Sequence, residues 1–170
     1  MLNVLRGNKK RRELAASLNA AMVARAREPK FFATFGVKDT LDGRFDLLVL
    51  HAWLVLERLQ EIGAASLSQA FVDAVFVGFD EALREMGAGD MGMGRRVKKL
   101  ADAFYGRMKA YRDATGEGGM EAALIRNLYR GEPEPGAKPL AHYVMSAKAR
   151  LKACEVENGR IDFGPLPGEE

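Results

Sequence analysis

The chain has 170 residues, of which 48% are apolar and 29% charged, a composition typical of one soluble globular domain with a real core. Its longest apolar run, residues 47–56, is interrupted by His51 and is far shorter than the ~20 residues of a membrane-spanning helix. The single cysteine, Cys154, excludes an internal disulfide framework and fits a reducing compartment, and the basic N-terminus lacks the continuous apolar segment of a secretory signal.

The net charge of +3 is unevenly distributed along the chain. Residues 1–30 carry eight Lys or Arg against two acids, and residues 91–112 carry seven against one. Such segregation favours contact with an anionic partner, either RNA, lipid headgroups or an acidic protein face. The alternative is that these residues form solvated helix faces that pair with acids of the same chain.

The first predicted element is a helix over residues 8–27, which Pro29 ends. It has a thin apolar stripe of Leu14, Leu18 and Met22, and the cations at residues 9–12 crowd its first turn, where the helix dipole disfavours them. Three aromatic side chains follow and are predicted to form a plug on the core: Phe31, Phe32 and Phe35.

The central element is a helix over residues 43–62, with Asp42 as the predicted N-cap and Gly63 as the stop. Its apolar side chains nearly surround its first half, so it is expected to contact more helices than any other element. Three leucines fall on the side that carries its acids: Leu47, Leu50 and Leu54. They are either core, or an apolar groove rimmed by acids that receives an apolar segment of a partner protein.

An amphipathic helix is predicted over residues 67–86, capped by Ser66 and Gln69 and antiparallel to the central helix. Four glycines occur among the next eight residues, 87–94. No strand precedes this loop and no Gly-Lys-Ser/Thr ending follows, so a phosphate-binding loop is not predicted. Met91 and Met93 are instead predicted to supply adaptable apolar contacts and to close over the leucine groove.

The basic segment forms a predicted helix over residues 95–115. On and beside one flank it carries the residues named here the basic flank: Arg95, Lys98, Lys99, Tyr105, Lys109 and Arg112. A basic helix with an exposed aromatic suits an anionic surface, either ribosomal RNA or membrane headgroups.

Two further helices are predicted over residues 120–130 and 139–157, and a short extended tail ends the chain. The predicted fold class is therefore all-α, a single-domain bundle of about six helices. The expected organisation is a basic helical arm (1–30), a helical domain (31–163) and a flexible tail (164–170).

No metal, cofactor or catalytic site is predicted. His51, His142 and Cys154 are too few to provide four zinc ligands, and no nucleophile is accompanied by a base. We therefore do not predict an enzyme. A haem held by the two histidines is an alternative to the interpretation of His51 as a hydrogen-bonded residue at the core boundary.

Four sequence blocks follow one another within residues 30–111. They are DTLDGRFDLLVLH at 39–51, LSQA at 67–70, LREMG with the following GD at 83–90, and KK with AFYGR at 98–107. In this order they resemble the ubiquinol–cytochrome c chaperone family. The resemblance implies a non-enzymatic chaperone.

The family's mitochondrial members assist newly made cytochrome b in early assembly of the respiratory bc1 complex. They act with a small partner and associate with the ribosome near the tunnel exit. The function implied here is therefore binding of newly made cytochrome b and promotion of bc1 assembly. Cytochrome b or another bc1 subunit is the implied partner, with the ribosome and the membrane surface as candidate further partners, and with no DNA and no small-molecule substrate.

The chain lacks the long N-terminal extension of the mitochondrial members, which favours a bacterial form. The expected location is the cytoplasm, with peripheral attachment to the cytoplasmic face of the inner membrane as an option. An RNA- or membrane-surface-binding module without a client is the alternative function, and a haem-handling protein is a third.

Overall fold

The computed structural model describes residues 2–85, 87 and 92–169. Within that part the chain contains no strand and six helices of several turns, which confirms the predicted all-α bundle. A single helical turn, α2 (Lys30–Ala33), and a 3-10 helix, η1 (Val156–Asn158), complete the secondary structure. The six long helices are α1 (Leu2–Ala26), α3 (Leu41–Glu61), α4 (Ala65–Glu85), α5 (Met93–Asp113), α6 (Gly116–Asn127) and α7 (Ala137–Leu151).

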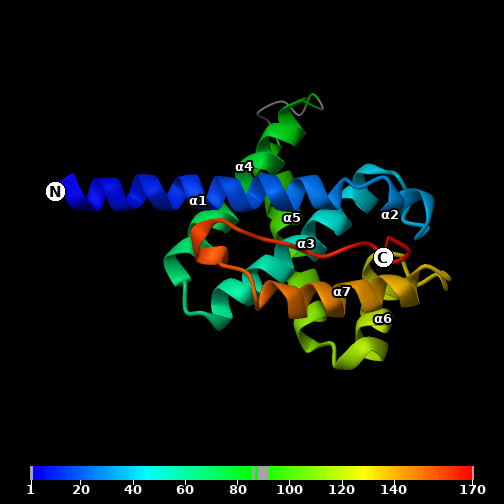
Figure 1. Cartoon of the computed structure of the whole chain (residues 1–170). Helices are drawn as coiled ribbons and strands as arrows, with labels where there is room; N and C mark the ends of the chain where they lie inside the picture. The colour runs from blue at the N-terminus through cyan, green and yellow to red at the C-terminus, as the bar shows by residue number, and fades with distance from the viewer. Residues whose placement is uncertain (1, 86, 88–91, 170) are drawn as a thin grey trace.

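Helix α3 lies at the centre of the bundle and packs on α1, α4, α5, α7 and η1, as predicted (Figure 1). Its cap is Thr40 rather than the predicted Asp42, because the Thr40 hydroxyl oxygen accepts a hydrogen bond from the Gly43 amide at 3.1 Å. A side chain at Gly43 would meet the Lys38 carbonyl oxygen at 2.0 Å. Glycine therefore allows the chain to turn tightly into this helix.

The middle of α3 is buried on every side, and its buried residues include Asp46 and His51 as well as apolar side chains. Val55, Leu56 and Leu59 are in the core, whereas Phe45 and Leu48 are only partly buried against it. Complete enclosure explains why this helix tolerates apolar residues in nearly every position of its second and third turns.

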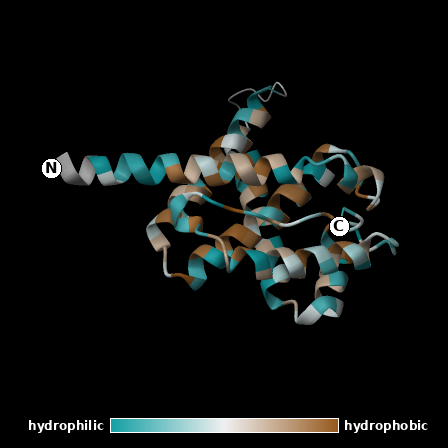
Figure 2. Ribbon diagram, viewed as in Figure 1, coloured by the Kyte–Doolittle hydropathy of each residue, from teal (hydrophilic) through white to brown (hydrophobic). Residues whose placement is uncertain are grey.

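Helix α1 packs along α3 and α4 through its second half. It begins at Leu2, earlier than the predicted residue 8, and its first turns project beyond the body of the protein (Figure 1). Leu18 and Met22 of its predicted stripe are buried, while Leu14 is partly buried. The projecting turns are mostly hydrophilic (Figure 2), because residues 9–12 are all cations.

The segment after α1 forms the predicted aromatic plug. Phe31 and Phe35 are buried, with ring centroids 6.1 Å apart, and Phe32 packs at the edge. The predicted cap of α4 by Ser66 and Gln69 is wrong. Helix α4 begins one residue before Ser66, and the Gln69 side chain donates to Asp73 instead.

Helices α6 and α7 pack on each other at the bottom of the bundle in Figure 1. Helix α7 starts at Ala137 instead of the predicted Pro139 and ends at Leu151 instead of residue 157. None of the helices in the described part of the chain combines the length and apolar character needed to cross a lipid bilayer.

The C-terminal segment lies against the body of the protein. Residues 160–166 run between α1 and α7 without helix or strand and are followed by a turn at residues 167–168, coloured red in Figure 1. Phe163 and Leu166 are 4% and 1% exposed, so the segment adds two apolar side chains to the core.

Candidate interaction surface

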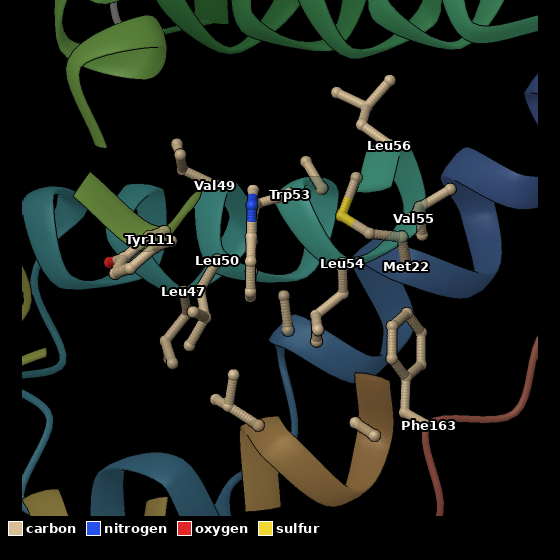
Figure 3. Close-up of a cluster of buried hydrophobic side chains, with 14 of the residues drawn as sticks. Met22, Leu47, Val49, Leu50, Trp53, Leu54, Val55, Leu56, Tyr111 and Phe163 are labelled. Carbon is tan, nitrogen blue, oxygen red and sulfur yellow. The ribbon is translucent and has the colours of Figure 1, made fainter. Parts of the chain in front are cut away.

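The three leucines predicted to form a client groove lie inside the protein. Leu47, Leu50 and Leu54 are 0%, 0% and 1% exposed, and they point from α3 toward α7 (Figure 3). The groove interpretation of these residues is therefore wrong and the core interpretation is right. Packing of α7 on α3 covers the side that sequence periodicity had assigned to the acids.

Met93 of the glycine-rich loop does not line an open groove, since it is the first residue of α5 and is only 8% exposed. Met91, the other methionine of that prediction, lies outside the described residues. The exposed surfaces of α4 and α5 therefore form the candidate interaction surface.

All six residues of the basic flank are exposed on α5. Lys109 pairs with Asp113 on the same helix, and Arg112 Nε lies 3.0 Å from Glu57 Oε1 of α3. Within the described part of the chain, no ion pair involves the remaining three cations, which are Arg95, Lys98 and Lys99. Free positive charge is thus concentrated in the first half of α5.

A cleft of about 480 Å³ opens between α4 and α5 and is named here the α4–α5 cleft. Its floor is apolar and contains Leu56, Val72 and Met108. Its rim is polar or charged and includes Gln60, Ser68, Gln69, Lys109 and Arg112. The cleft joins three elements because α4 and α5 both pack on α3 and leave this space between them.

Tyr105 is the exposed aromatic of the α4–α5 cleft, with 56% of its surface accessible. Its ring stacks on Phe76 of α4, with centroids 6.4 Å apart and an interplanar angle of 24°. The stack holds the phenol at the edge of the cleft, where one face of the ring is supported and the rest is available. An aromatic that is rigid and exposed is typical of protein interfaces.

An ion triad centred on the buried Asp46 anchors one side of α5. Asp46 of α3 is fully buried, 2.6 Å from Arg107 Nε and 2.7 Å from Arg130 Nη2. Arg107 lies about 200° around α5 from both Tyr105 and Lys109, at 100° per residue. The Asp46–Arg107 pair therefore anchors one side of α5 and turns the opposite side toward solvent.

The environment of the triad perturbs its carboxylate. Burial raises the pKa of Asp46 to about 6, and this outweighs the opposite effect of the Arg107 and Arg130 guanidinium groups. Among the described residues other than glycine, Arg130 is the one with a positive φ, 59°. Arg130 therefore reaches Asp46 from a backbone conformation that residues with a side chain rarely adopt.

His51 is buried in the core rather than at its boundary. Its Nδ1–H donates to the Leu47 carbonyl at 2.7 Å, so Nε2 accepts from the Tyr143 hydroxyl at 2.9 Å. Burial lowers the pKa of His51 to about 4, which keeps the ring neutral. Because both ring nitrogens are engaged, His51 offers no ligand to a haem iron. His142 is exposed on α7, 3.3 Å from Glu117.

The sequence analysis missed two features that shape the surface. Helical periodicity places Asp46 on the acidic side of α3, although a carboxylate beside Leu47 in an otherwise apolar helix is a signal for a buried ion pair. Phe163 and Leu166 in the tail were a signal for docking. No group of three His, Cys, Asp or Glu side chains is assembled for a metal ion among the described residues.

Comparison with known proteins identifies the fold. The family model described as Ubiquinol-cytochrome C chaperone matches residues 33–158, which include α3 to α7 and the α4–α5 cleft. The chain is similar to the crystal structure of the Cbp3 homolog from Brucella abortus, with 35% identity, a TM-score of 0.84 and coverage of 98% of both chains. No curated protein matches the sequence. The sequence match over most of the chain and the structural match over nearly all of it agree. The chain belongs to the ubiquinol–cytochrome c chaperone family.

Proposed function

We propose that this protein is a non-enzymatic assembly chaperone that binds newly made cytochrome b and promotes assembly of the cytochrome bc1 complex. Membership of the chaperone family supports the role in bc1 assembly. The observation that carries the proposed binding site is the α4–α5 cleft, in which an apolar floor lies beside the exposed Tyr105 ring.

The chemistry of the cleft suits a segment of a membrane protein that has not yet reached the bilayer. Leu56, Val72 and Met108 offer apolar contacts, and a thioether adapts to side chains of different shape. Lys109 and Arg112 at the rim offer partners for acidic groups next to an apolar segment. Such a site would cover part of the apolar surface of the client segment without enclosing the whole segment.

Substitution of the cleft is expected to reduce capture of cytochrome b. Tyr105→Ser combined with Val72→Asp removes the aromatic contact and places a charge in the apolar floor, while both side chains are at least partly accessible. We expect roughly a tenfold or greater loss of co-purified cytochrome b, as for removal of an interface hot spot. The measurement is affinity purification of the tagged, full-length chain from source membranes.

The matched control for the cleft variant is Val77→Asp, which places the same charge on the same helix. Val77 is 57% exposed and does not line the cleft. It should leave cytochrome b capture unchanged, and circular dichroism should show that all variants are folded. Equal capture by the cleft variant and the control would remove the α4–α5 cleft from the proposal.

The basic flank supports a second proposed contact, with an anionic surface that is either ribosomal RNA or membrane headgroups. Its unpaired cations carry this proposal, so the reversal of Arg95, Lys98 and Lys99 to Glu is a cleaner test than reversal of the paired Arg112. We expect this variant to lose co-sedimentation with ribosomes or anionic vesicles while it stays folded. Binding by the wild-type protein should weaken steeply with added salt.

The outcome of that reversal distinguishes binding from simple solvation. Glu81, Glu85 and Asp73 on the neighbouring helix are exposed, so their substitution by Gln or Asn provides a control with altered charge on α4. If the reversed variant still co-sediments at low salt, the basic flank is a solvated face. Binding to bare RNA or vesicles that persists in the Tyr105→Ser, Val72→Asp variant, together with no cytochrome b in any purification, would favour the module without a client.

A further inference from the structure

The C-terminal segment, residues 160–169, is named here the strap, and it runs between α1 and α7 (Figure 1). The surface of the protein on which it lies is named here its groove. In the described chain, no main-chain hydrogen bond connects residues 161–169 to the main chain of a helix. Side chains make the links instead. Arg25 donates to the Gly164 carbonyl at 2.7 Å, and the Cys154 thiol lies 3.9 Å from the Asp162 carbonyl.

Phe163 and Leu166 are the two buried apolar side chains of the strap. Phe163 lies with its ring 5.3 Å from the His51 ring, and Leu166 is almost fully buried three residues later. The charges at the two ends of the strap form ion pairs, Asp162 with Arg150 at 3.1 Å and Glu169 with Lys30 at 3.4 Å. The strap is therefore bound as an extended peptide ligand would be, by two side-chain pockets and peripheral charges.

The strap does not fill its groove. A space of about 500 Å³ remains between the strap and α7, and the α7 side of this space is formed by His142, Ser146 and Arg150. None of the residues around it lines the α4–α5 cleft. The groove is thus a separate surface with room for a bulkier segment than the strap.

The floor beneath Phe163 is suited to an aromatic ring. Phe31, His51 and Tyr143 form a buried aromatic cluster, with ring centroids 5.2 Å apart for Phe31 and His51 and 5.9 Å apart for His51 and Tyr143. Phe163 belongs to the same buried cluster as the α3 leucines (Figure 3). Arg25 beside it is placed to donate a hydrogen bond to a main-chain carbonyl, as it does to that of Gly164.

We propose that this groove is a peptide-binding site and that the strap is its intramolecular placeholder. The occupant that displaces the strap is an extended client segment with an aromatic side chain followed three residues later by an aliphatic one. This inference rests on the proposed function, since a newly made client offers extended segments before it folds. The strap begins just after residue 158, where the match to the family model ends.

The test uses the full-length protein with Phe163→Ser and Leu166→Ser, which releases the strap from its two pockets. The probe is a fluorescein-labelled peptide with the sequence of residues 159–170, GRIDFGPLPGEE. The released variant is expected to bind this peptide at least about tenfold more tightly than the wild-type chain, because the tethered competitor has been removed. A peptide with serine at both apolar positions is the control and should not bind.

A folded variant that fails to bind the wild-type peptide, or that binds the serine peptide equally, would overturn the inference. Should the variant fail to fold, digestion of the wild-type chain with thermolysin decides. If the rate of cleavage before Phe163 does not change when low concentrations of urea are added, the strap opens locally, and this supports the proposal. Cleavage that requires global unfolding contradicts it. Neither result depends on cytochrome b, so failure here would leave the α4–α5 cleft as a client site.

Discussion

Leu50→Asp is expected to abolish the cooperative unfolding transition of this protein. Leu50 is fully buried on the central helix α3, within the apolar core. A carboxylate buried without a partner costs several kcal/mol, a large part of the ~5–15 kcal/mol that stabilises a typical domain. Urea denaturation followed by circular dichroism and by the fluorescence of the buried Trp53 measures the effect.

The matched control is Leu41→Asp, which introduces the same group on the same helix. Leu41 is 64% exposed in the first turn of α3, where a negative charge is favourable to the helix dipole. Its unfolding midpoint should stay close to that of the wild type. A Leu50→Asp variant with an equally unchanged midpoint would mean that this side of α3 opens in solution, and the groove interpretation would then return.

The stability of two single-residue variants is expected to change in opposite directions between pH 6 and pH 4. Burial lowers the pKa of His51 from 6.5 to about 4, so the folded state rejects a proton that the unfolded chain accepts. The contribution of neutral His51 to the free energy of unfolding is fully present above pH 6.5 and is lost as the pH falls toward 4. Burial raises the pKa of Asp46 from 3.8 to about 6, so the folded state accepts a proton that the unfolded chain rejects. Its contribution is present below pH 3.8 and is lost as the pH rises through 6.

Because the two windows overlap, the effects nearly cancel in the wild-type protein. One pH unit of differential binding of one proton corresponds to about 1.4 kcal/mol. Because each group is only partly titrated at one end of this range, each accounts for about 2 kcal/mol between pH 6 and pH 4. Relative to the wild type, the free energy of unfolding of His51→Gln should rise by that amount from pH 6 to pH 4. That of Asp46→Asn should fall by a similar amount.

Chemical denaturation at several pH values between 4 and 6 measures both changes. His142→Gln and Asp102→Asn are exposed substitutions of the same kinds and should follow the wild-type profile. If Asp46→Asn instead became relatively more stable at low pH, the Arg107 and Arg130 guanidinium groups would dominate over burial at this site. If His51→Gln followed the wild type, the imidazole would be protonated to the same degree in both states.

The position of the central helix could be predicted because the information for it is local. Apolar side chains cover nearly the whole circumference of the helix over residues 45–56. Only enclosure by several other helices can bury such a surface. The same pattern could not say which helix covers which side. Leu47 and Leu54 fitted both a core and a groove, since the answer depends on α7, far along the chain.

The ion triad around Asp46 and the strap depended on contacts between distant segments. Asp46 looks like any solvent-facing acid in an amphipathic pattern until the packing of α5 brings Arg107 to it and the turn after α6 brings Arg130. The extended segment around Phe163 has neither helical nor strand periodicity to indicate a docking side. The basic flank was accessible to prediction, because outward-facing cations require only the local period of a helix.

Helix α1 combines two selective regimes in one continuous helix. Replacements at Leu18, Met22 and Ala26 must respect the volume of a filled core, so drift there is limited by folding alone. The projecting turns around residues 9–12 touch little of the body, so folding leaves their sequence free to diverge. If relatives keep positive charge in these turns while the other residues vary, selection for folding cannot explain it. Such a pattern would indicate selection for binding to an external partner.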